Sequence, residues 1–456
     1  MFRMDKDKEL TPDILLEFIT KAKENNLRFE ELRSWYVGNH PIFYQKEKDS
    51  NKPDNRVAVN FAKYITDTFN GFFIGNPIST SVSDGNDVIA ETIEFIEKYN
   101  DQDDNNAELA KLMSIYGKAY EMYFVDEAKN IGITYVDPRE AFMIYDEGIV
   151  EEPIAFVHFY KNEEKEDVGS VSDATKVRYF KINSKSEVEF HDEVEHGFNG
   201  VPATEYIENE ERMGLYESVI SLMKAYDKAI SEKANDVDYF ADAYLLVKGP
   251  KLSDKDTTYI KNNRMINLFD ETDDNSALPG MDARFIEKPN ADDTQEHLLE
   301  KLERLIYTTS MVPDVNSTTF GSSSGIAMQY KLFNVRNLFK TKVRKFTSGM
   351  NRRWKLIFSH QIVSGVGQDD WVKLEYTFTP NIPANLKDEA DTASTLSGIV
   401  SKYTQLKLLS CVDNVHEELD RIEKEDSQDT TLIQGLFDDH DHVEDVSDED
   451  EEEIQE

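Results

Sequence analysis

A serine flanked by glycines is the first pattern in this chain that could carry out a reaction. Gly321-Ser322-Ser323-Ser324-Gly325 matches G-x-S-x-G, in which a strand-to-helix turn exposes a nucleophilic serine. A helical pattern follows the motif, but the preceding PDVNSTTF is a weak strand, and the alternating strand and helix units of that hydrolase fold are missing upstream. A flexible Ser/Gly loop is the favoured interpretation, and a serine hydrolase with Ser323 as nucleophile is the alternative.

Metal and cofactor patterns are weaker still. His440 and His442 lie among carboxylates and could share a divalent ion, but a solvated tail explains them more simply. The acidic turns Asp101–Asp104 and Asp270–Asp274 lack the glycine and final glutamate of a calcium loop, so we predict solvated loops. The phosphate-binding, dinucleotide and metalloprotease motifs are absent from the sequence. We therefore predict no catalytic residue, no metal, no cofactor and no enzymatic activity.

Charge is unevenly distributed along the chain. There are 90 acidic and 51 basic residues, a formal net charge of -39, yet no Asp or Glu occurs from Val315 to Gln368. So acidic a surface repels phosphate and anionic lipid, which argues against a sequence-reading DNA-binding protein. A passage through which a duplex must slide is nevertheless better lined with repulsion than with attractive charge. Something local excludes acids from this one run.

The remaining composition predicts a soluble intracellular protein. Cys411 is the single cysteine, so no disulfide can form within the chain. The first residues contain no apolar leader, and no run of apolar residues approaches the eighteen or so that a membrane-spanning helix needs.

The acid-free run contains the strongest helical pattern. Nine apolar residues recur at steps of three and four and predict a long helix from about Ile326: Met328, Leu332, Val335, Phe339, Val343, Phe346, Met350, Trp354 and Ile357. Nine cations surround that stripe: Lys331, Arg336, Lys340, Lys342, Arg344, Lys345, Arg352, Arg353 and Lys355. They could contact DNA phosphate or meet acids of another copy of the chain. The second interpretation is favoured because the rest of the chain is acidic.

The other elements indicate an α+β fold. Thr11-Pro12-Asp13 predicts a helix start, and short strands follow within residues 133–194. A long helix over 215–247 and a helix over 292–310 should pair antiparallel, with a compact insert between Gly249 and Pro289 at their far tip. In that insert we expect a helix ending at Asn262 after a Ser253/Asp256 capping box, and strands at 265–269 and 283–287. A strand over 371–380, two or three helices over 386–425 and a disordered acidic tail complete the pattern.

The order of several segments resembles the portal proteins of long-tailed phages that infect Gram-positive bacteria. The resemblance extends from about residue 30 to 365. It is carried by WYVGNHPI (Trp35–Ile42), NRVAVNFAKYITDTFNGFFIGNPI (Asn55–Ile78), YGKAYEMYFVD, VDPREAFMIYD, HGFNGVP, AYDKAISEKANDVDYFADAYLLVKG and SSSGIAMQYKLF. It implies a ring-forming portal fold with wing, stem, clip and crown regions. The implied parts are a wing (1–215), a first stem helix (216–244), a clip (245–289), a second stem helix (290–312), a tunnel loop (313–325), a long helix with a wing return strand (326–382), a crown (383–430) and an acidic tail (431–456).

The resemblance also implies a function. Such chains form a homo-oligomeric ring, usually of twelve, at a capsid vertex, through which double-stranded DNA is packaged and ejected without sequence specificity. Terminase and then the head-tail connector dock on the ring, which also meets scaffolding or capsid proteins, assembles in the host cytoplasm and does not contact a membrane. A non-viral ring-forming adaptor is a further alternative.

Two sets of residues receive roles from this resemblance. The channel loop comprises Asn316, Ser317, Thr318, Thr319, Phe320, Gly321, Ser322, Ser323, Ser324 and Gly325, and the clip docking residues are Lys251, Asp254, Lys255, Asp270 and Asp273. An acid in the loop, repeated around a ring at its narrowest point, would concentrate repulsion where clearance is least. That is a candidate reason for the acid-free run.

Overall fold

The computed structural model describes most of the chain in two compact units. The described residues are 1–48, 53–241, 245–248, 265–268, 282–285, 292–316, 325–382, 386–409, 411–412 and 414–425. One unit comprises residues 1–381, and the other begins at Ile382. The mixture of helices and sheets confirms the α+β prediction. Over the described ranges, no helix is both long and apolar enough to cross a lipid bilayer.

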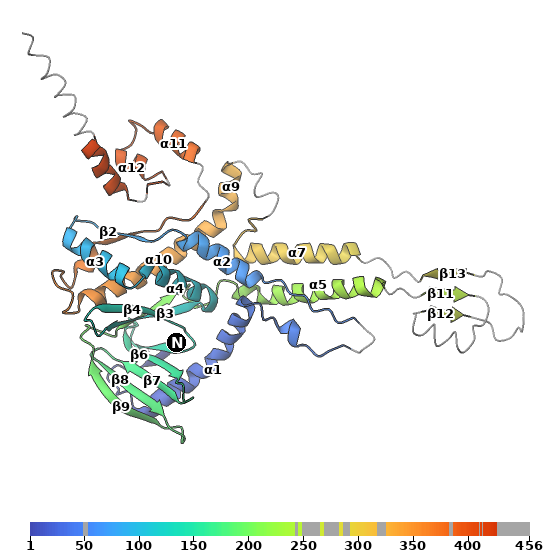
Figure 1. The fold of residues 1–456 in the computed structure, drawn as a ribbon, viewed down its shortest axis with the longest axis horizontal. Coiled ribbons are helices and arrows are strands. Elements are labelled where there is room, and N and C mark those ends of the chain that lie inside the picture. The colour runs from blue at the N-terminus through green and yellow to red at the C-terminus, as the bar shows by residue number, and fades with distance from the viewer. Residues whose placement is uncertain are drawn as a thin grey trace, which may run out of the picture. The chain divides into compact units, whose positions relative to one another are not determined.

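The N-terminal part of the first unit is a six-stranded sheet covered by a helix (Figure 1). The strand order is β1 (Phe2–Met4), β5 (Ala141–Asp146), β6 (Pro153–Lys161), β7 (Asp167–Ser172), β8 (Lys176–Ile182) and β9 (Val188–Glu195). Helix α1 (Pro12–Tyr36) begins as predicted, because the Thr11 side chain accepts the N–H of Ile14. Leu15 and Ile19 of α1 share a buried apolar cluster with Phe142 of β5.

A second group of strands and helices packs around the long helix of the acid-free run. Strands β10 (Ala203–Ile207), β3 (Lys118–Val125) and β4 (Ile131–Val136) form a sheet, and β2 (Ser79–Val82) pairs with β14 (Leu374–Thr377). Helices α2 (Phe61–Ile74), α3 (Asp87–Tyr99) and α4 (Gln102–Tyr116) lie nearby, together with α10 (Phe333–Phe358). Trp354 and Ile357 of α10 are buried in one cluster with Ile89 and Ile93 of α3, so the long helix belongs to the core.

The WYVGNHPI segment connects the end of α1 to α5. It contains the end of α1 and the start of the short 3-10 helix η1 (Pro41–Tyr44). His40 is fully buried, and its Nδ1 lies 2.5 Å from Oδ2 of Asp227 on α5 (Ile220–Ala241). The other oxygen of Asp227 accepts the backbone N–H of Val59 at 3.1 Å. This buried pair explains why the segment needs a histidine at that position.

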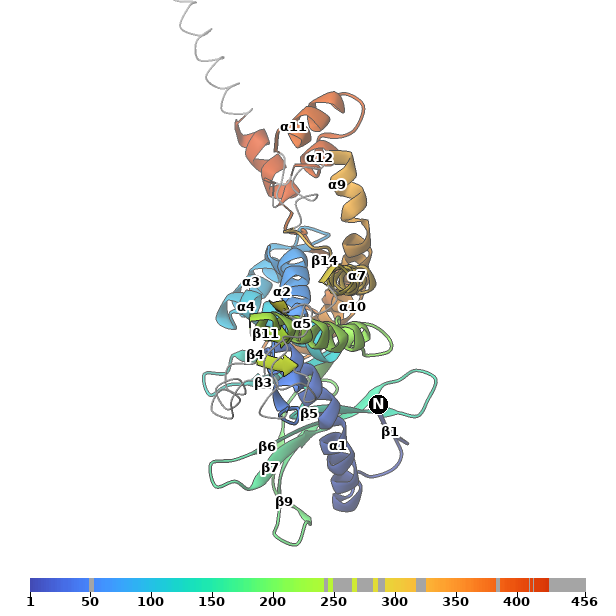
Figure 2. The ribbon, with the colours of Figure 1, turned by 90° about the vertical axis from the view of Figure 1, so that its right-hand side faces the viewer.

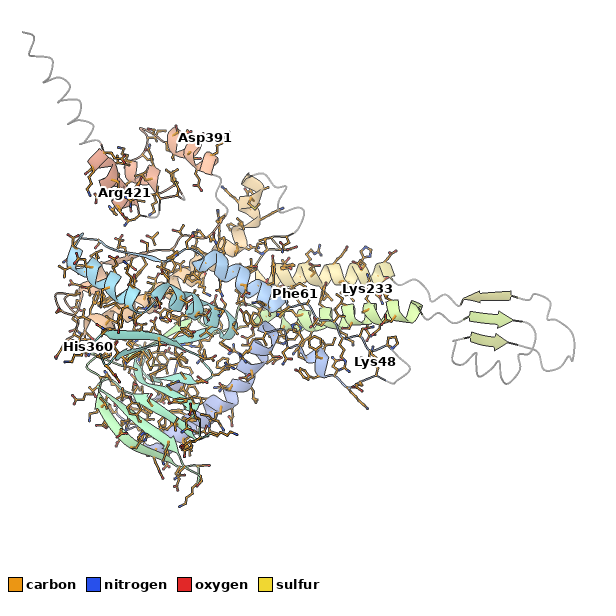
Figure 3. All side chains as sticks on the ribbon, in the orientation of Figure 1. Lys48, Phe61, Lys233, His360, Asp391 and Arg421 are labelled. Atoms are coloured by element: carbon orange, nitrogen blue, oxygen red, sulfur yellow. The ribbon has the colours of Figure 1, made fainter. Side chains whose placement is uncertain are left out.

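Helices α5 and α7 (Asp292–Ser310) pack side by side and antiparallel, as the sequence predicts (Figure 1). At one end, Lys233 pairs with Glu296, and Gln295 Nε2 donates to Asp236 Oδ2 at 2.7 Å. Towards the other end, Tyr226 and Tyr307 both pack edge-on against Phe61 of α2. Figure 3 shows Phe61 where α2 meets the pair and Lys233 further along it.

The insert between these two helices is a small sheet. Strands β12 (Met265–Leu268) and β13 (Asp282–Phe285) occur where the sequence predicts strands. A third strand, β11 (Leu245–Lys248), lies between them, so the expectation of helix through Val247 is wrong. Leu245, Leu246 and Val247 suit a strand, and pairing on both sides decides their conformation. The expected helix ending at Asn262, with its Ser253/Asp256 cap, lies outside the described residues.

The long helix of the acid-free run is divided in two. Helix α9 (Gly325–Lys331) ends one residue before Leu332, and α10 follows. Val335, Phe346, Met350, Trp354 and Ile357 are buried, so this part of the apolar stripe packs in the core of its own chain. The strand predicted over 371–380 is shorter than expected, because Asp370–Lys373 forms the 3-10 helix η3 and only Leu374–Thr377 pairs as β14.

The second unit is helical where it is described. It contains α11 (Leu386–Thr395), α12 (Lys402–Leu406) and a helical segment over residues 415–425. These three segments agree with the predicted two or three helices. The predicted acidic tail (431–456) lies outside the described residues.

Candidate functional site

The predicted channel loop is described only at its two ends. Ser317, Thr318, Thr319, Phe320, Gly321, Ser322, Ser323 and Ser324, and with them the alternative nucleophile, lie outside the described residues. Before the loop, the N–H of Val315 donates to the Tyr64 hydroxyl of α2 at 2.9 Å. The N–H of Asn316 donates to Asp314 Oδ1 at 3.0 Å, and Gly325 opens α9 after the loop. The base of the loop is therefore attached to α2 where α7 ends.

The clip docking residues cannot be placed in the same way. Lys251, Asp254, Lys255, Asp270 and Asp273 lie outside the described residues, and so do His440 and His442. Within the described ranges, no group of three or more His, Cys, Asp and Glu side chains is arranged to hold a metal ion.

Lys342 of α10 is buried inside its own subunit. The side chain is 1% exposed, and Nζ lies 2.8 Å from Oε2 of Glu208, whose side chain is 7% exposed. The ammonium also donates to Ser114 Oγ at 2.6 Å and to the carbonyl of Ala110 at 2.9 Å. Burial lowers the pKa of Lys342 below its ordinary value. All of these partners of the ammonium belong to its own chain.

Arg353 is buried in the same way. Its Nε and Nη2 donate to the two oxygens of Glu121 on β3, both at 2.8 Å, and Nη2 also donates to Asn106 Oδ1 at 2.7 Å. Tyr123 and Tyr206 donate to the same carboxylate at 2.8 and 3.0 Å. The expectation that these cations face another subunit or DNA is therefore contradicted for Lys342 and Arg353. Their hydrophobic surroundings require acids from strands and loops of their own chain, which composition alone does not reveal.

The other cations of the run lie nearer the surface. Lys340 and Arg344 are exposed, whereas Lys331 and Arg336 are partly buried. Lys345 pairs with Glu210, and Arg352 donates to the carbonyls of Val201 and Ala203, both at 3.2 Å. Burial lowers the pKa of Arg352.

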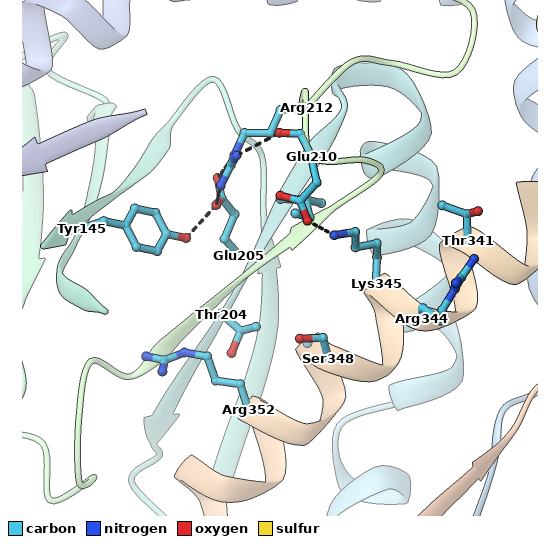
Figure 4. A pocket seen from close by; sticks show the side chains of 12 residues that line it. Tyr145, Thr204, Glu205, Glu210, Arg212, Thr341, Arg344, Lys345, Ser348 and Arg352 are labelled. Carbon is cyan, nitrogen blue, oxygen red and sulfur yellow. Dashed lines mark hydrogen bonds and ion pairs between the residues drawn. The ribbon is translucent and has the colours of Figure 1, made fainter. Parts of the chain in front are cut away.

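A basic cleft of about 540 Å³ lies along this side of α10. Figure 4 shows Arg344, Lys345 and Arg352 on α10, with Tyr145, Glu205 and Arg212 across from them. Arg212 Nη2 donates to Glu205 at 2.9 Å, and the Tyr145 hydroxyl donates to it at 2.6 Å. Glu205 is thus already satisfied, and the cations of α10 determine the charge of the cleft.

An acidic hollow of about 760 Å³, which the sequence did not reveal, lies where α3 meets the start of α4. Its carboxylates come from Glu94, Glu97, Asp101, Asp103 and Asp104. The expectation of a solvated loop at Asp101–Asp104 is wrong for most of its length, because Gln102 begins α4. The spacing of 94, 97, 101 and 104 by three, four and three residues is a sequence signal that could have identified a shared face.

Two acceptors in this hollow lack a strong partner. Burial raises the pKa of Glu97 to about 7, and its carboxylate accepts a bond from Thr80 at 3.3 Å. Gln102 is 2% exposed, and its Oε1 has no hydrogen-bond partner among the residues that the structure describes. The hollow therefore favours a cationic donor with several N–H groups.

A family match and a sequence relative agree on the class of protein. The family described as "Phage portal protein, SPP1 Gp6-like" matches residues 16–432. The portal protein of Clostridium phage phiCD119 is 23% identical over 419 residues, which cover 85% of this chain and 90% of that relative. A solved structure described as the neck of an empty GTA particle computed with C6 symmetry covers 76% of this chain and 89% of its own, at 9% identity and a TM-score of 0.44. Because the family match spans most of the sequence, the chain belongs to the SPP1 Gp6-like family of phage portal proteins, structural components of the virion that form a multimeric ring at a capsid vertex.

Proposed function

We propose that twelve copies of this chain surround the channel through which double-stranded DNA enters and leaves the capsid. The observation that carries the assignment of parts is the antiparallel pair α5 and α7, joined through the three strands β11, β12 and β13. In this proposal the helix pair is the stem, the strands belong to the clip, and residues 313–325 are the tunnel loop. Residues 1–215 form the wing, 326–382 form the long helix and the wing return strand, and 383–430 form the crown.

The charge distribution supports a sliding rather than a gripping channel. A duplex carries about one negative charge per 1.7 Å, so a cationic bore would hold it through counterion release. Residues Asn316 to Gly325 contain no charged side chain, whereas the whole chain carries -39. Small neutral side chains at the narrowest point can touch DNA without binding it tightly. The attachment of Val315 to Tyr64 fixes where the loop leaves the stem.

The clip is the proposed docking surface for terminase during packaging and for the head-tail connector afterwards. Lys251, Asp254, Lys255, Asp270 and Asp273 supply charges of both signs for that contact. The sequence has no phosphate-binding motif, so the force for translocation comes from the terminase and the portal itself needs no catalysis and no cofactor. Scaffolding or capsid proteins contact the ring while it assembles in the host cytoplasm.

Site-specific crosslinking tests the channel assignment. In a Cys411→Ser background, a photo-crosslinker is attached to Ser323→Cys in the loop or, as a control, to Ile149→Cys, a fully exposed position between β5 and β6. In DNA-filled particles we expect crosslinks to DNA from position 323 and none above background from position 149. Equal crosslinking from both positions, or crosslinking from position 149 alone, would overturn the assignment.

A further inference from the structure

We propose that neighbouring subunits of the ring are joined when Lys340 and Arg344 on α10 of one copy enter the acidic hollow formed by α3 and the start of α4 of the next. The inference rests on ring assembly and deepens it, because it names the two surfaces that meet. Neither surface follows from the family to which the chain belongs. Both follow from which charges the chain satisfies internally and which it leaves unsatisfied.

The cationic side is a ridge on α10. Lys340 and Arg344 are four residues apart, so they lie on one face of the helix, and both are exposed. Arg344 donates through Nε to the carbonyl of Lys340 at 3.2 Å. Across the part of the chain that the structure describes, neither cation pairs with a carboxylate. Lys342, Lys345 and Arg353 on the same helix all do.

This contrast divides the cations of α10 into two functional groups. The acid-free run supplies internal partners for Glu208, Glu210 and Glu121, and on one face of α10 it also presents the exposed pair Lys340 and Arg344. An acid on the exposed face would neutralise those two within the helix. The absence of acids from α10 therefore keeps the ridge available for a partner.

The anionic side is the hollow beside α3. Its carboxylates outnumber its one cation, Lys98, which already pairs with Glu94 at 2.5 Å. The unsatisfied Oε1 of Gln102 is an independent sign that a donor is missing, since buried polar groups normally have hydrogen-bond partners. A guanidinium carries five N–H donors in a fixed plane and can serve a carboxylate and an amide oxygen together. Arg344 of a neighbouring copy has the matching chemistry.

The helices that carry the two surfaces lie on different sides of α2. Figure 2 shows α3 and α4 to the left of α2 and α10 to its right. A closed ring with cyclic symmetry is built from heterologous contacts, in which one face of a subunit meets a different face of the next. Opposite charges on the two faces match copies head to tail and oppose contact between like faces.

DNA is the competing partner for the ridge. A second copy is the favoured partner of the ridge, because each subunit carries one acidic hollow whose charge is complementary to one ridge. DNA binding by Lys340 and Arg344 would leave Gln102 Oε1 without a donor and Glu97 without a cationic partner. The two partners are separated by the test below.

Charge reversal with rescue is the experiment. The purified full chain is prepared as wild type, Arg344→Glu, Asp104→Arg and the double variant, and its assembly is measured by native mass spectrometry over a range of concentrations. Both side chains are exposed, so the monomers should fold, which far-ultraviolet circular dichroism checks. Lys355→Glu reverses another exposed cation of α10 and serves as the matched control.

We expect each single reversal to raise the concentration for half-assembly at least tenfold and the double variant to restore most of the loss. Lys355→Glu should assemble like wild type. A wild type that never forms rings would refute the ring itself. Rings unaffected by the single reversals would overturn this interface and leave the ring intact. If the single variants lost assembly and the double variant did not regain it, the specific pairing would be overturned. If the single variants formed intact rings and lost only DNA binding, the ridge would be assigned to DNA.

Discussion

Replacing Lys342 with methionine tests whether the centre of the first unit depends on a buried ion pair. Methionine has a similar length and volume, so the substitution leaves no large cavity around α10. It removes the ammonium that lies 2.8 Å from Glu208, where the two side chains are 1% and 7% exposed. Glu208 then remains as a buried carboxylate without its cation.

The size of the effect follows from that burial. Removing one member of a buried pair costs about 3 to 5 kcal/mol, because the remaining charge is desolvated without compensation. Removing both members is often neutral or stabilising. Lys342→Met should therefore lower the free energy of unfolding by about 3 to 5 kcal/mol, and Lys342→Met/Glu208→Met should recover most of it. Lys355→Met on the exposed face of α10 should change it by no more than about 0.5 kcal/mol.

Urea unfolding of the monomeric chains provides the measurement. Trp354 is fully buried on α10, so its fluorescence reports the loss of this core. If Lys342→Met lowered the free energy of unfolding by less than about 1 kcal/mol relative to Lys355→Met, the ion pair would contribute less to stability than we predict. A double variant less stable than the single one would show that the carboxylate is not the source of the cost.

Three further substitutions test the hollow and the packing of α10. The pKa of Glu97 is raised to about 7 from an ordinary 4.5, so its stabilising contribution is complete below about pH 4.5 and is lost as the pH rises through about 7. Glu97→Gln should remove about 2 kcal/mol of that pH dependence between pH 5 and 8 in monomer unfolding, and parallel pH profiles would contradict it. At Gly349 a Cβ atom would lie 2.3 Å from the Tyr206 ring, so Gly349→Ala should destabilise by about 1 to 3 kcal/mol. Gly71→Ala, a helical position with open space, should be neutral or stabilising by up to about 1 kcal/mol in the same denaturation assay, and equal effects at both glycines would refute the packing argument.

Periodic patterns of apolar residues predicted much of the fold, because the buried face of a helix or strand requires apolar side chains. The stripe from Val335 to Ile357 could be recognised because most of its residues are buried in the core. The start of α1 could also be predicted from the sequence, since Thr11 caps the helix through a hydrogen bond to a residue only three positions further on. Strand β11 was not, because Leu245 to Val247 continue a helical spacing and only pairing with β12 and β13 makes them a strand.

The candidate site was less predictable, because the sequence around a charged residue does not show which residue it pairs with. Lys340 and Lys342 have the same side chain and lie two residues apart, yet one is exposed and the other is buried against Glu208. That partner is more than a hundred residues away in the sequence. The unsatisfied oxygen of Gln102 is likewise visible only when its neighbours are known. Composition could identify the acid-free run, but only the structure separates its internal cations from its outward ones.

Electron microscopy of the purified, assembled protein tests the central claim most directly. The account predicts a closed ring of about 630 kDa, from twelve chains of 52.5 kDa, with an axial opening. The α5 and α7 pairs should surround that opening, residues 313–325 should point into it, and α10 of each copy should face α3 of the next. A solid particle, or a ring that carries residues 313–325 on its outer rim, would contradict it.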